Sequence, residues 1–285
     1  MTTCTIVIPC YNESARLDVE AFRRFVTPVH RVRFLLVDDG STDDTATVLD
    51  GLRASDPARF AVHSLSRNRG KAEAVRQGIL RALEGDADAV GFWDADLATP
   101  LEAIPEFCDR LAANPALRMV FGARVKLLGR HVERSAVRHY LGRVFATAAS
   151  TVLGLPIYDT QCGAKLFRAG DETRALFTQP FRTNWIFDVE ILARFRRLCR
   201  SAELGPLELG PPELGPPEQA IYELPLSRWR DVAGSKVKPH DFFKAFFELG
   251  TIYWTYLRRG AKGDVCLPSR PRREAESPER PRRAA

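Results

Sequence analysis

The stretch Ala89-Val90-Gly91-Phe92-Trp93-Asp94-Ala95-Asp96 places five uncharged residues directly before two carboxylates. The uncharged part predicts a buried strand, and the alternation of strand residues puts Asp94 and Asp96 on one side of the chain at its end. Two hard oxygen donors at this spacing could share one Mg²⁺ or Mn²⁺ ion. Because D-x-D patterns are also common in solvated loops, this interpretation depends on the strand that precedes them.

Further apolar runs alternate with helical patterns along the first part of the chain. This order predicts an α/β fold with a Rossmann-like, mostly parallel sheet and helices on both of its faces. Ligands of such sheets bind at the carboxyl ends of the strands, so polar residues at those ends are the candidates for a site. The expected strands are Thr5–Ile8, Val32–Val37, Ala61–Leu65, Ala89–Trp93 and Met119–Phe121, and the expected helices are Leu17–Phe25, Thr45–Arg53, Ala72–Leu83 and Leu101–Ala113.

Composition narrows the class of protein. The chain has 285 residues, 45% of them hydrophobic, which is enough for a large core. The net charge is +6, half of it in the last 20 residues, and this modest excess suits anionic ligands or a lipid surface better than nucleic acid. Six scattered cysteines lack zinc-site or disulfide-scaffold spacing, which favours a reducing cytosol. We expect no signal peptide and no membrane-spanning helix.

The chain is expected to form one domain over residues 1–258, with amphipathic helices in its C-terminal part. Residues 205–219 read GPLELGPPELGPPEQ, a five-residue repeat too rich in Pro and Gly for helix or sheet, which predicts a flexible insertion. Residues 259–285 are rich in Arg, Pro and Glu and have few apolar side chains to bury. They are expected to form a disordered basic tail.

The first two expected strands both end in polar motifs. Ile8-Pro9-Cys10-Tyr11-Asn12-Glu13 offers an aromatic ring and a carboxylate that could hold a nucleobase, although an ordinary turn with Asn12 or Ser14 capping the next helix is an equal alternative. After the second strand, Asp38 and Asp39 repel each other unless one accepts hydrogen bonds from a ligand or from backbone donors. Asp43 or Asp44 is expected to cap the following helix.

Three later segments carry further candidates. Arg67-Asn68-Arg69-Gly70-Lys71 combines cations, a Gly turn and a helix N-terminus, which suits a phosphate cradle or, equally, an exposed basic turn, since P-loop spacing is absent. Asp159 lies near a Gly turn, and Asp188 opens an apolar helix that it could simply cap. Arg230 and Lys236 flank a Gly turn and could clamp a diphosphate, with a flexible surface loop as the alternative.

Seven motifs together resemble the family 2 glycosyltransferases, especially the dolichyl-phosphate glucosyl- and mannosyltransferases and their bacterial polyprenyl-phosphate relatives. The resemblance spans roughly residues 3–258 and follows the family's order. The motifs are TIVIPCYNE, VDDGSTDDT, NRGKAEAVRQG, DADLATP, DTQCGAKLF, FDVE and GSKV.

The resemblance implies a GT-A fold, with residues 1–125 binding a nucleotide sugar and residues 126–258 the acceptor. The nucleotide-sugar residues would be Pro9, Tyr11, Glu13, Val37, Asp39, Lys71, Asp94, Ala95, Asp96, Arg124, Arg230 and Lys236, with Asp94 and Asp96 also holding Mg²⁺ or Mn²⁺. Asp159 and Asp188 are the candidates for a catalytic role, Asp159 as a base or as an orienting group.

The resemblance further implies transfer of a hexose to a polyprenyl or dolichyl phosphate, with inversion at the anomeric carbon. DTQCGAKLF is closer to the glucosyl branch, so UDP-glucose is the first expected donor and GDP-mannose the second. An acceptor phosphate with a second pKa of about 6 is already largely anionic at neutral pH and needs little deprotonation. Positioning and electrostatic stabilisation of the leaving nucleotide would then dominate the rate gain.

Many lipid-phosphate relatives carry C-terminal transmembrane helices; we expect none in this sequence and therefore expect membrane contact to come from other segments. The segment His131–Leu153 has apolar residues at helical spacing, and Arg130, Arg134 and Arg138 beside them; Arg134 and Arg138 are the candidates for binding the acceptor phosphate. Phe242–Arg258 has a narrow polar stripe and could lie in a bilayer interface, or its apolar face could be buried in the protein's own core. We expect a cytoplasmic protein, peripheral to the cytoplasmic face of a membrane.

The same sequence features allow three other interpretations of the function. The same fold could act on a soluble or polysaccharide acceptor, which would require no exposed apolar surface on these two helices. A non-catalytic nucleotide-sugar-binding scaffold is disfavoured by the intact Asp94 and Asp96 pair. A nucleotidyltransferase is disfavoured because the first strand is not followed by a Gly-rich loop that contains Arg and Lys.

Overall fold

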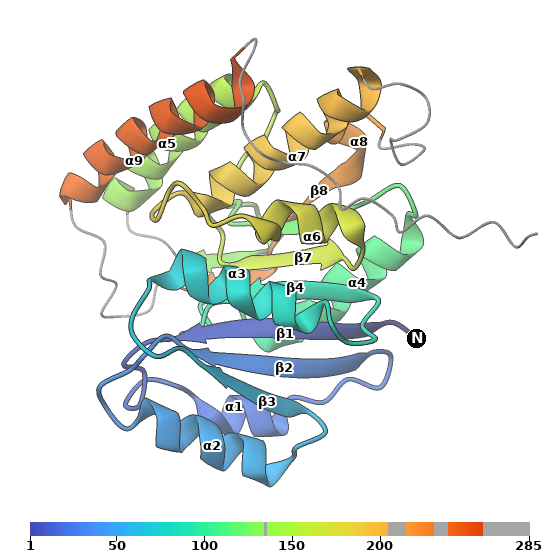
Figure 1. Cartoon of the computed structure of the whole chain (residues 1–285), viewed down its shortest axis with the longest axis vertical. Coiled ribbons are helices and arrows are strands. Elements are labelled where there is room, and N and C mark those ends of the chain that lie inside the picture. The colour runs from blue at the N-terminus through green and yellow to red at the C-terminus, as the bar shows by residue number, and fades with distance from the viewer. Residues whose placement is uncertain (134–135, 205–214, 231–238, 259–285) are drawn as a thin grey trace, which may run out of the picture.

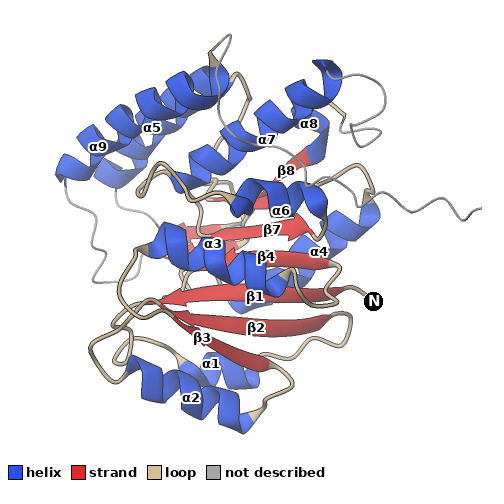
Figure 2. Ribbon diagram, in the orientation of Figure 1, coloured by secondary structure: helices blue, strands red, loops and turns tan. Residues whose placement is uncertain are grey.

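A seven-stranded sheet forms the centre of the molecule (Figures 1 and 2). The computed structural model describes residues 1–133, 136–204, 215–230 and 239–258. The strand order is β3-β2-β1-β4-β7-β5-β8. The strands are β1 (Thr3–Cys10), β2 (Arg31–Asp38), β3 (Phe60–Ser64), β4 (Ala89–Trp93), β5 (Met119–Ala123), β7 (Ala164–Arg168) and β8 (Ile221–Pro225).

The sheet is mostly parallel, as the alternating pattern predicted. Strands β1 to β4 form a parallel block, and β8 runs parallel to β5. In the register of β1 and β2, Cys10 lies opposite Asp38, so the loops after these strands leave the sheet at one edge. Only β7, among the described strands of this sheet, runs antiparallel to its neighbours β4 and β5. Its first residues therefore lie beside the carboxyl end of β4.

Helices cover both faces of the sheet, which confirms the expected layers. On one face, Ile6, Ile8 and Phe34 pack against α1 (Val19–Arg24), α2 (Thr45–Ser55) and α4 (Ile104–Ala113). On the other face, Val7 and Phe92 belong to a second core. The helices of that core are α3 (Lys71–Ala82), α5 (Ala136–Leu153), α6 (Asp171–Thr178), α7 (Phe187–Leu204) and α9 (Pro239–Ile252).

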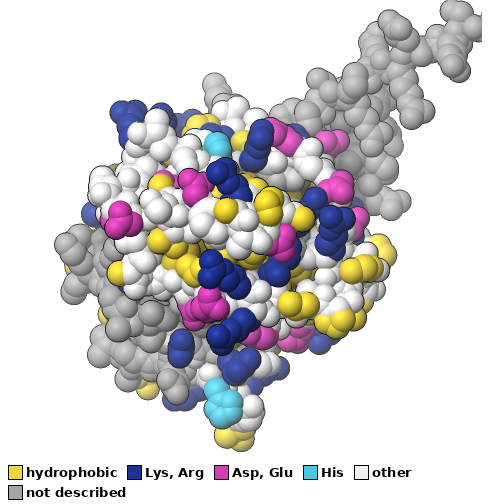
Figure 3. All heavy atoms as spheres, turned by 90° about the horizontal axis from the view of Figure 1, so that it is seen from below, with side chains coloured by type: hydrophobic (Ala, Val, Ile, Leu, Met, Phe, Trp, Pro, Cys, Tyr) yellow, Lys and Arg dark blue, Asp and Glu magenta, His cyan; other side chains and the backbone are white. Residues whose placement is uncertain are grey.

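Short elements complete the described fold. They are η1 (Leu101–Ala103), α8 (Pro217–Ala220), the π-helical turn η2 (Tyr253–Leu257), and a two-stranded ribbon of β6 (His131–Glu133) and β9 (Arg228–Arg230). None of the helices within the described ranges is both long and apolar enough to cross a membrane. On the face shown in Figure 3, Lys and Arg side chains are interspersed with Asp and Glu rather than gathered in one basic patch.

The expected helix over His131–Leu153 begins too early. Residues 131–133 form strand β6, and α5 begins at Ala136. Val132 is buried and pairs with Trp229 on β9, so its place in the helical spacing was a coincidence. Arg130 therefore lies before a strand and not at a helix start, and its side chain donates to the Ser227 hydroxyl at 3.1 Å.

Two other expectations need correction. The expected strands end at Phe121, but β7 and β8 also join the main sheet; Lys165 and Arg168 interrupt the apolar pattern of β7. The repeat over residues 205–219 was expected to contain no helix, yet Pro217 to Gln219 lie in α8, where Pro217 occupies the first turn and needs no N–H partner. Residues 205–214 and the tail 259–285 lie outside the described residues.

Candidate active site

Side chains connect the loop after β1 to the loop after β2. Asn12, at a left-handed φ of 52°, accepts from the Thr42 N–H at 2.9 Å, and Ser14 donates to Asp43 at 2.6 Å. Helix α1 is capped instead by Asp18. The capping alternative for Asn12 and Ser14 is therefore wrong, whereas Asp43 does accept the Thr45 N–H at the start of α2.

Asp39 resolves the expected repulsion with Asp38 by accepting backbone donors. Its two oxygens accept the N–H groups of Arg69 at 2.7 Å and Gly70 at 2.8 Å, and Asp38 accepts the Ser41 N–H at 3.0 Å. Burial raises the pKa of Asp39 although these two N–H groups act to lower it. This carboxylate therefore fixes the loop before α3 against the loop after β2.

The remaining candidates from the first two strands lie at this edge of the sheet. Glu13 forms a bidentate ion pair with Arg16, with N–O distances of 2.9 and 3.0 Å. Tyr11 is half-buried, and Pro9 lies opposite Val37 in the sheet register. The Val37 side chain is fully buried in the core, so only its backbone could line a nucleotide pocket.

Asp94 and Lys71 meet at the end of β4. The Lys71 ammonium lies 2.5 Å from Asp94 Oδ1, across the gap between the start of α3 and the DAD segment. Burial acts to lower the pKa of Lys71, but Asp94 and Asp188 more than offset this, and the net pKa is raised. The predicted phosphate cradle thus places a permanent cation directly beside the D-x-D motif.

Gly163 makes room for the Asp94 carboxylate. A Cβ at Gly163 would lie 1.9 Å from Asp94 Oδ2, and the Gly163 carbonyl accepts the Asp94 N–H at 3.0 Å. The segment before β7 therefore holds Asp94 in place. Any residue with a Cβ at position 163 would collide with the Asp94 carboxylate in its present position. The Gly turn after Asp159 was noticed in the sequence, but its contact with Asp94 depends on β7 pairing with β4.

The two carboxylates fit a hard divalent cation. Asp94 contacts the Lys71 ammonium, and burial, followed by repulsion from Asp94, raises the pKa of Asp96, so a further cation beside Asp96 would stabilise its ionised form. No cluster of three or more His, Cys, Asp or Glu residues able to hold a metal occurs within the described ranges. Two carboxylates alone suit Mg²⁺ or Mn²⁺ that takes its other ligands from substrate phosphates and water.

Asp188 is committed to a buried lysine. Lys165 is fully buried, and its ammonium lies 2.6 Å from Asp188 Oδ1 and donates to the Cys162 carbonyl at 2.6 Å. Asp188 is the second residue of α7, so the pair joins that helix to β7. Sequence reasoning missed Lys165; the signal was a lysine inside the apolar run of DTQCGAKLF.

Asp159 is committed to an arginine. Arg124, just after β5, donates to both Asp159 oxygens, at 2.6 Å from Nε and 2.7 Å from Nη2, and its backbone N–H adds a third bond of 3.0 Å. Glu223 on β8 accepts the N–H groups of Tyr158 and Asp159, each at 2.8 Å. Asp159 is 6% exposed. This arrangement suits an orienting role for Asp159 better than that of a general base.

A small, partly open hollow lies between α5 and the segment 158–161. Arg124 and Arg143 line it, and Arg143 also stacks on the Tyr158 ring, with its guanidinium carbon 3.8 Å from the ring centre. Thr160 lines it too, and its buried hydroxyl has no hydrogen-bond partner among the described residues. Asp159 lines the hollow as well and balances the charge of Arg124. Arg143 and the unsatisfied Thr160 hydroxyl are therefore the groups suited to an anionic ligand.

The outer candidates are only partly placed. Arg230 ends β9 with an exposed side chain, and its N–H donates to the Ala98 carbonyl at 3.2 Å, so β9 lies beside the DAD segment. Ala95 is buried within that segment. Lys236, Arg134 and the side chain of Arg138 lie outside the described residues. Their assignments stay predictions.

Fold and site together define a GT-A glycosyltransferase that uses a nucleotide sugar: carboxylates and a lysine gather at the carboxyl edge of a mostly parallel sheet. The model of glycosyl transferase family 2 matches residues 5–172, and the chain belongs to this family.

Three known proteins illustrate the relationship. The chain is 30% identical over 274 residues to a dolichyl-phosphate β-glucosyltransferase of Saccharomyces cerevisiae, covering 89% of this chain and 75% of the relative. Glucosyl-3-phosphoglycerate synthase from Mycobacterium tuberculosis, solved with UDP, shares its fold with a TM-score of 0.55 at 19% identity, over 88% of this chain and 80% of that one. A mannosyltransferase from Pyrobaculum calidifontis, solved with GDP-mannose and Mn²⁺, gives 0.55 at 16% identity, over 88% and 62%.

Proposed function

We propose that this enzyme transfers glucose from UDP-glucose to the phosphate of a dolichyl or other polyprenyl phosphate, with inversion, at the cytoplasmic face of a membrane. The observation that carries the donor half is the contact between Lys71 and Asp94, with Asp96 on the same turn. The identity to dolichyl-phosphate β-glucosyltransferases supports the choice of sugar and acceptor.

At the donor end, Asp94 and Asp96 would hold Mg²⁺ or Mn²⁺, which supplies positive charge to the leaving diphosphate. Lys71 adds a second cation at the same point, and Arg230 a third from β9. Because the Lys71 ammonium is held by its ion pair with Asp94 before substrate binds, it would stabilise the departing nucleotide with little reorganisation. Asp39, Tyr11 and Glu13 are proposed to contact the nucleoside.

At the acceptor end, no side chain has to act as a base. The acceptor phosphate is already anionic, because its second pKa is about 6. Its oxygen forms the bond to the anomeric carbon while the bond to UDP breaks, and UDP leaves with that electron pair. Arg124 is held by Asp159 in one orientation, and we assign to this pair the alignment of the phosphate. Asp188 acts by fixing Lys165 and the start of α7.

The lipid part of the acceptor is supported by an exposed apolar face on α5, α9 and η2. These elements lie side by side in Figure 1, and Phe145 packs edge-on against Phe246 at a centroid distance of 5.9 Å. Exposed fractions in this face reach 80% for Phe243 and Phe247. The apolar face consists of Tyr140, Leu141, Val144, Phe243, Phe246, Phe247, Tyr253 and Trp254.

This exposure separates the proposal from a soluble or polysaccharide acceptor. A monomeric soluble enzyme has little reason to expose several aromatic side chains on adjacent helices, whereas a bilayer interface accepts them. The hollow with Arg143 and Thr160 lies against the same helix α5, where it could receive the phosphate of a lipid whose chain follows the apolar face. Arg134 and Arg138 stay proposed partners of that phosphate.

The test combines donors and acceptors in one assay. Purified protein with Mn²⁺ or Mg²⁺ is incubated with labelled UDP-glucose, GDP-mannose or other nucleotide sugars, and with either polyprenyl phosphate or a soluble phosphomonoester. We expect label from UDP-glucose to enter the lipid phase in a metal-dependent manner, and to vanish in Asp96→Ala. Transfer to the soluble acceptor alone would show that the acceptor is not a lipid phosphate. A lack of interaction with every donor would contradict the proposal that the protein is a glycosyltransferase.

A further inference from the structure

Five consecutive backbone N–H groups, from Arg182 to Ile186, donate hydrogen bonds to the carboxylates of Glu190 and Glu248. Glu190 accepts those of Arg182 and Thr183, each at 2.9 Å, and the Thr183 hydroxyl at 2.9 Å. Glu248 accepts the next three, from Asn184 at 3.3 Å and from Trp185 and Ile186 at 3.1 Å. The segment 182–186 therefore takes its conformation from two side chains outside it.

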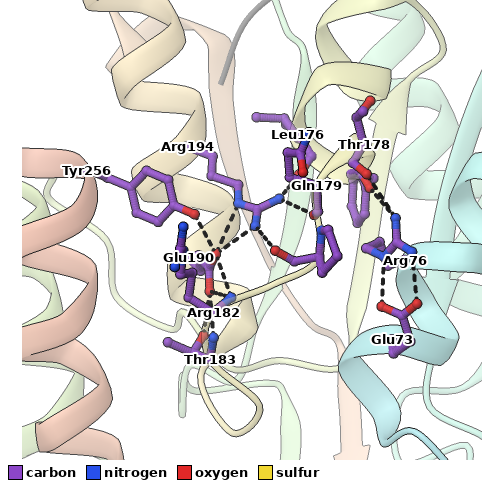
Figure 4. Close-up of polar contacts among 12 residues, drawn as sticks. Glu73, Arg76, Leu176, Thr178, Gln179, Arg182, Thr183, Glu190, Arg194 and Tyr256 are labelled. Carbon is purple, nitrogen blue, oxygen red and sulfur yellow. Dashed lines mark hydrogen bonds and ion pairs between the residues drawn. The ribbon is translucent and has the colours of Figure 1, made fainter. Parts of the chain in front are cut away.

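The Glu190 carboxylate is buried and accepts several hydrogen bonds (Figure 4). Glu190 is fully buried and pairs with Arg194, whose Nη2 lies 2.8 Å away, and it accepts the Tyr256 hydroxyl at 2.8 Å. Arg194 in turn donates to the carbonyls of Leu176, Gln179 and Pro180. Buried charges with this many partners hold one geometry, so residues 182 and 183 are firmly placed.

The Glu248 half comes from a different part of the molecule. Glu248 is half-buried on α9, next to Leu249, which belongs to the core. Phe243 and Phe247 lie four residues apart on the outer side of the same helix and belong to the exposed apolar face. Helix α9 thus presents a carboxylate to the segment 184–186 on one side and aromatic rings to the exterior on the other.

The segment held by Glu248 leads directly into the donor site. Ile186 is followed by Phe187, whose ring centre lies 6.0 Å from the Lys71 ammonium, and by Asp188, which pairs with Lys165 at 2.6 Å. Asp188 also contributes to the raised pKa of Lys71. A displacement of residues 184–186 would therefore be passed to the surroundings of Lys71 within two residues of chain.

We propose that Glu248 is a positioning residue that connects the membrane-facing helix to the donor site. It fixes residues 184–186, and through them Phe187 and Asp188, from a helix whose outer side contacts the lipid surface, so that seating α9 on a membrane steadies the donor site. The membrane part of this inference rests on the proposed function. The positioning part does not, because it depends only on contacts within the chain.

Amide hydrogen exchange tests the positioning part residue by residue. In Glu248→Ala, we expect the amides of 184–186 to lose protection by about tenfold or more, because each loses a charge-assisted bond, while 182 and 183 keep theirs on Glu190. Glu248→Gln retains one acceptor oxygen and should give an intermediate loss. Unchanged exchange at 184–186 in Glu248→Ala would overturn the inference.

Steady-state kinetics tests the consequence for the donor site. We expect kcat in Glu248→Ala to fall about tenfold with detergent-solubilised polyprenyl phosphate, while its affinity for vesicles stays at the wild-type value. Glu248→Gln should recover part of kcat. If Glu248→Gln and Glu248→Ala have the same thermal midpoint, a general loss of stability cannot explain that recovery. Glu84→Gln, which removes an exposed carboxylate paired with Arg81, is the matched control and should change neither quantity. A kcat equal to wild type in Glu248→Ala would contradict the inference.

The connection to the membrane has its own readout. Vesicles of phosphatidylcholine and an anionic lipid, without acceptor or donor, should raise the protection of amides 184–186 in the wild type and leave Glu248→Ala unaffected. No rise in the wild type would overturn the coupling. A rise without any sugar transfer to lipid would support the coupling and reject the proposed acceptor, so the two failures are distinguishable.

Discussion

The Lys71 ammonium lies 2.5 Å from Asp94 Oδ1, so the cation at the start of α3 is paired with the first carboxylate of the D-x-D motif. A divalent cation bound by Asp94 has to share that carboxylate with Lys71. The lysine therefore has two opposing effects: it competes with the metal for Asp94, and it attracts the diphosphate that both cations bind.

Replacing Lys71 should separate these two effects. In Lys71→Met, we expect Mn²⁺ to bind the free protein about tenfold more tightly, because a competing positive charge is removed. UDP-glucose should bind more weakly, and kcat/KM should fall about 100-fold, because a cation that stabilises the leaving group is lost. Electron paramagnetic resonance of Mn²⁺ and calorimetry of UDP-glucose measure the two. A loss of metal and donor affinity together would contradict this division of roles.

Gly163→Ala should damage the site while sparing the fold. The added Cβ would lie 1.9 Å from Asp94 Oδ2, and the carboxylate, as the end of a short side chain, can turn away without moving the sheet. We expect Mn²⁺ affinity to be lost and kcat to fall by about 100-fold or more, with the free energy of unfolding lowered by about 1 kcal/mol.

A glycine in open surroundings is the matched control. Gly51 lies in α2 with nothing within 4 Å of its added Cβ, so Gly51→Ala should keep full activity and gain about 0.5–1 kcal/mol of stability. Thermal unfolding and kinetics on both variants make the comparison. Full activity in Gly163→Ala would show that Asp94 does not need its present position.

Asp159→Asn distinguishes an orienting group from a general base. The asparagine keeps the size of Asp159 but loses the bidentate ion pair with Arg124. We expect kcat/KM for the lipid phosphate to fall about 30-fold, as for other losses of a charge-assisted contact. The acid limb of the pH profile should stay near pH 6 in the variant, because it reports the second pKa of the acceptor phosphate. Disappearance of that limb would identify Asp159 as the base.

The apolar face should govern vesicle binding. Phe243→Ser with Phe247→Ser removes two side chains that are each 80% exposed, and burying a Phe in an interface contributes about 1.5–3 kcal/mol. We expect partition to vesicles to fall by at least about tenfold, with calorimetric UDP-glucose affinity in solution unchanged. Val26→Ser, at 77% exposure outside this face, is the control and should bind vesicles like the wild type. Equal binding by the double variant would assign the face to another partner.

Much of the fold followed from the sequence, because strands β1, β2 and β4 are largely buried and contain apolar runs. Strand β7 escaped this pattern because Lys165 lies within it, and a lysine is tolerated there only because Asp188, 23 positions further along the chain, neutralises it. Strand β6 was missed because Val132 fits the spacing of an amphipathic helix. In the structure, Val132 instead pairs with Trp229 on β9.

The sequence predicted which residues of the candidate site lie at the ends of strands. It did not predict which of these residues contact one another. Local spacing places Asp94, Lys71 and Asp159 at loops, and none of it reveals that Lys71 contacts Asp94 or that Arg124 occupies both oxygens of Asp159. The Lys71–Asp94 contact depends on α3 packing over β1 and β4, and the Arg124–Asp159 contact depends on β5 lying beside β7. The role of Gly163 depends on β7 lying beside β4.

The most direct test of the central claim is the structure of the product. UDP-glucose, Mn²⁺ and a short polyprenyl phosphate are incubated with the enzyme, and the anomeric proton of the lipid-linked sugar is observed by NMR, including its coupling to phosphorus. We predict a β-linked glucosyl phosphate, because one displacement inverts the α-linked donor. An α-linked product, or glucose released without a bond to the lipid phosphate, would contradict single displacement onto a phosphate held beside Arg124.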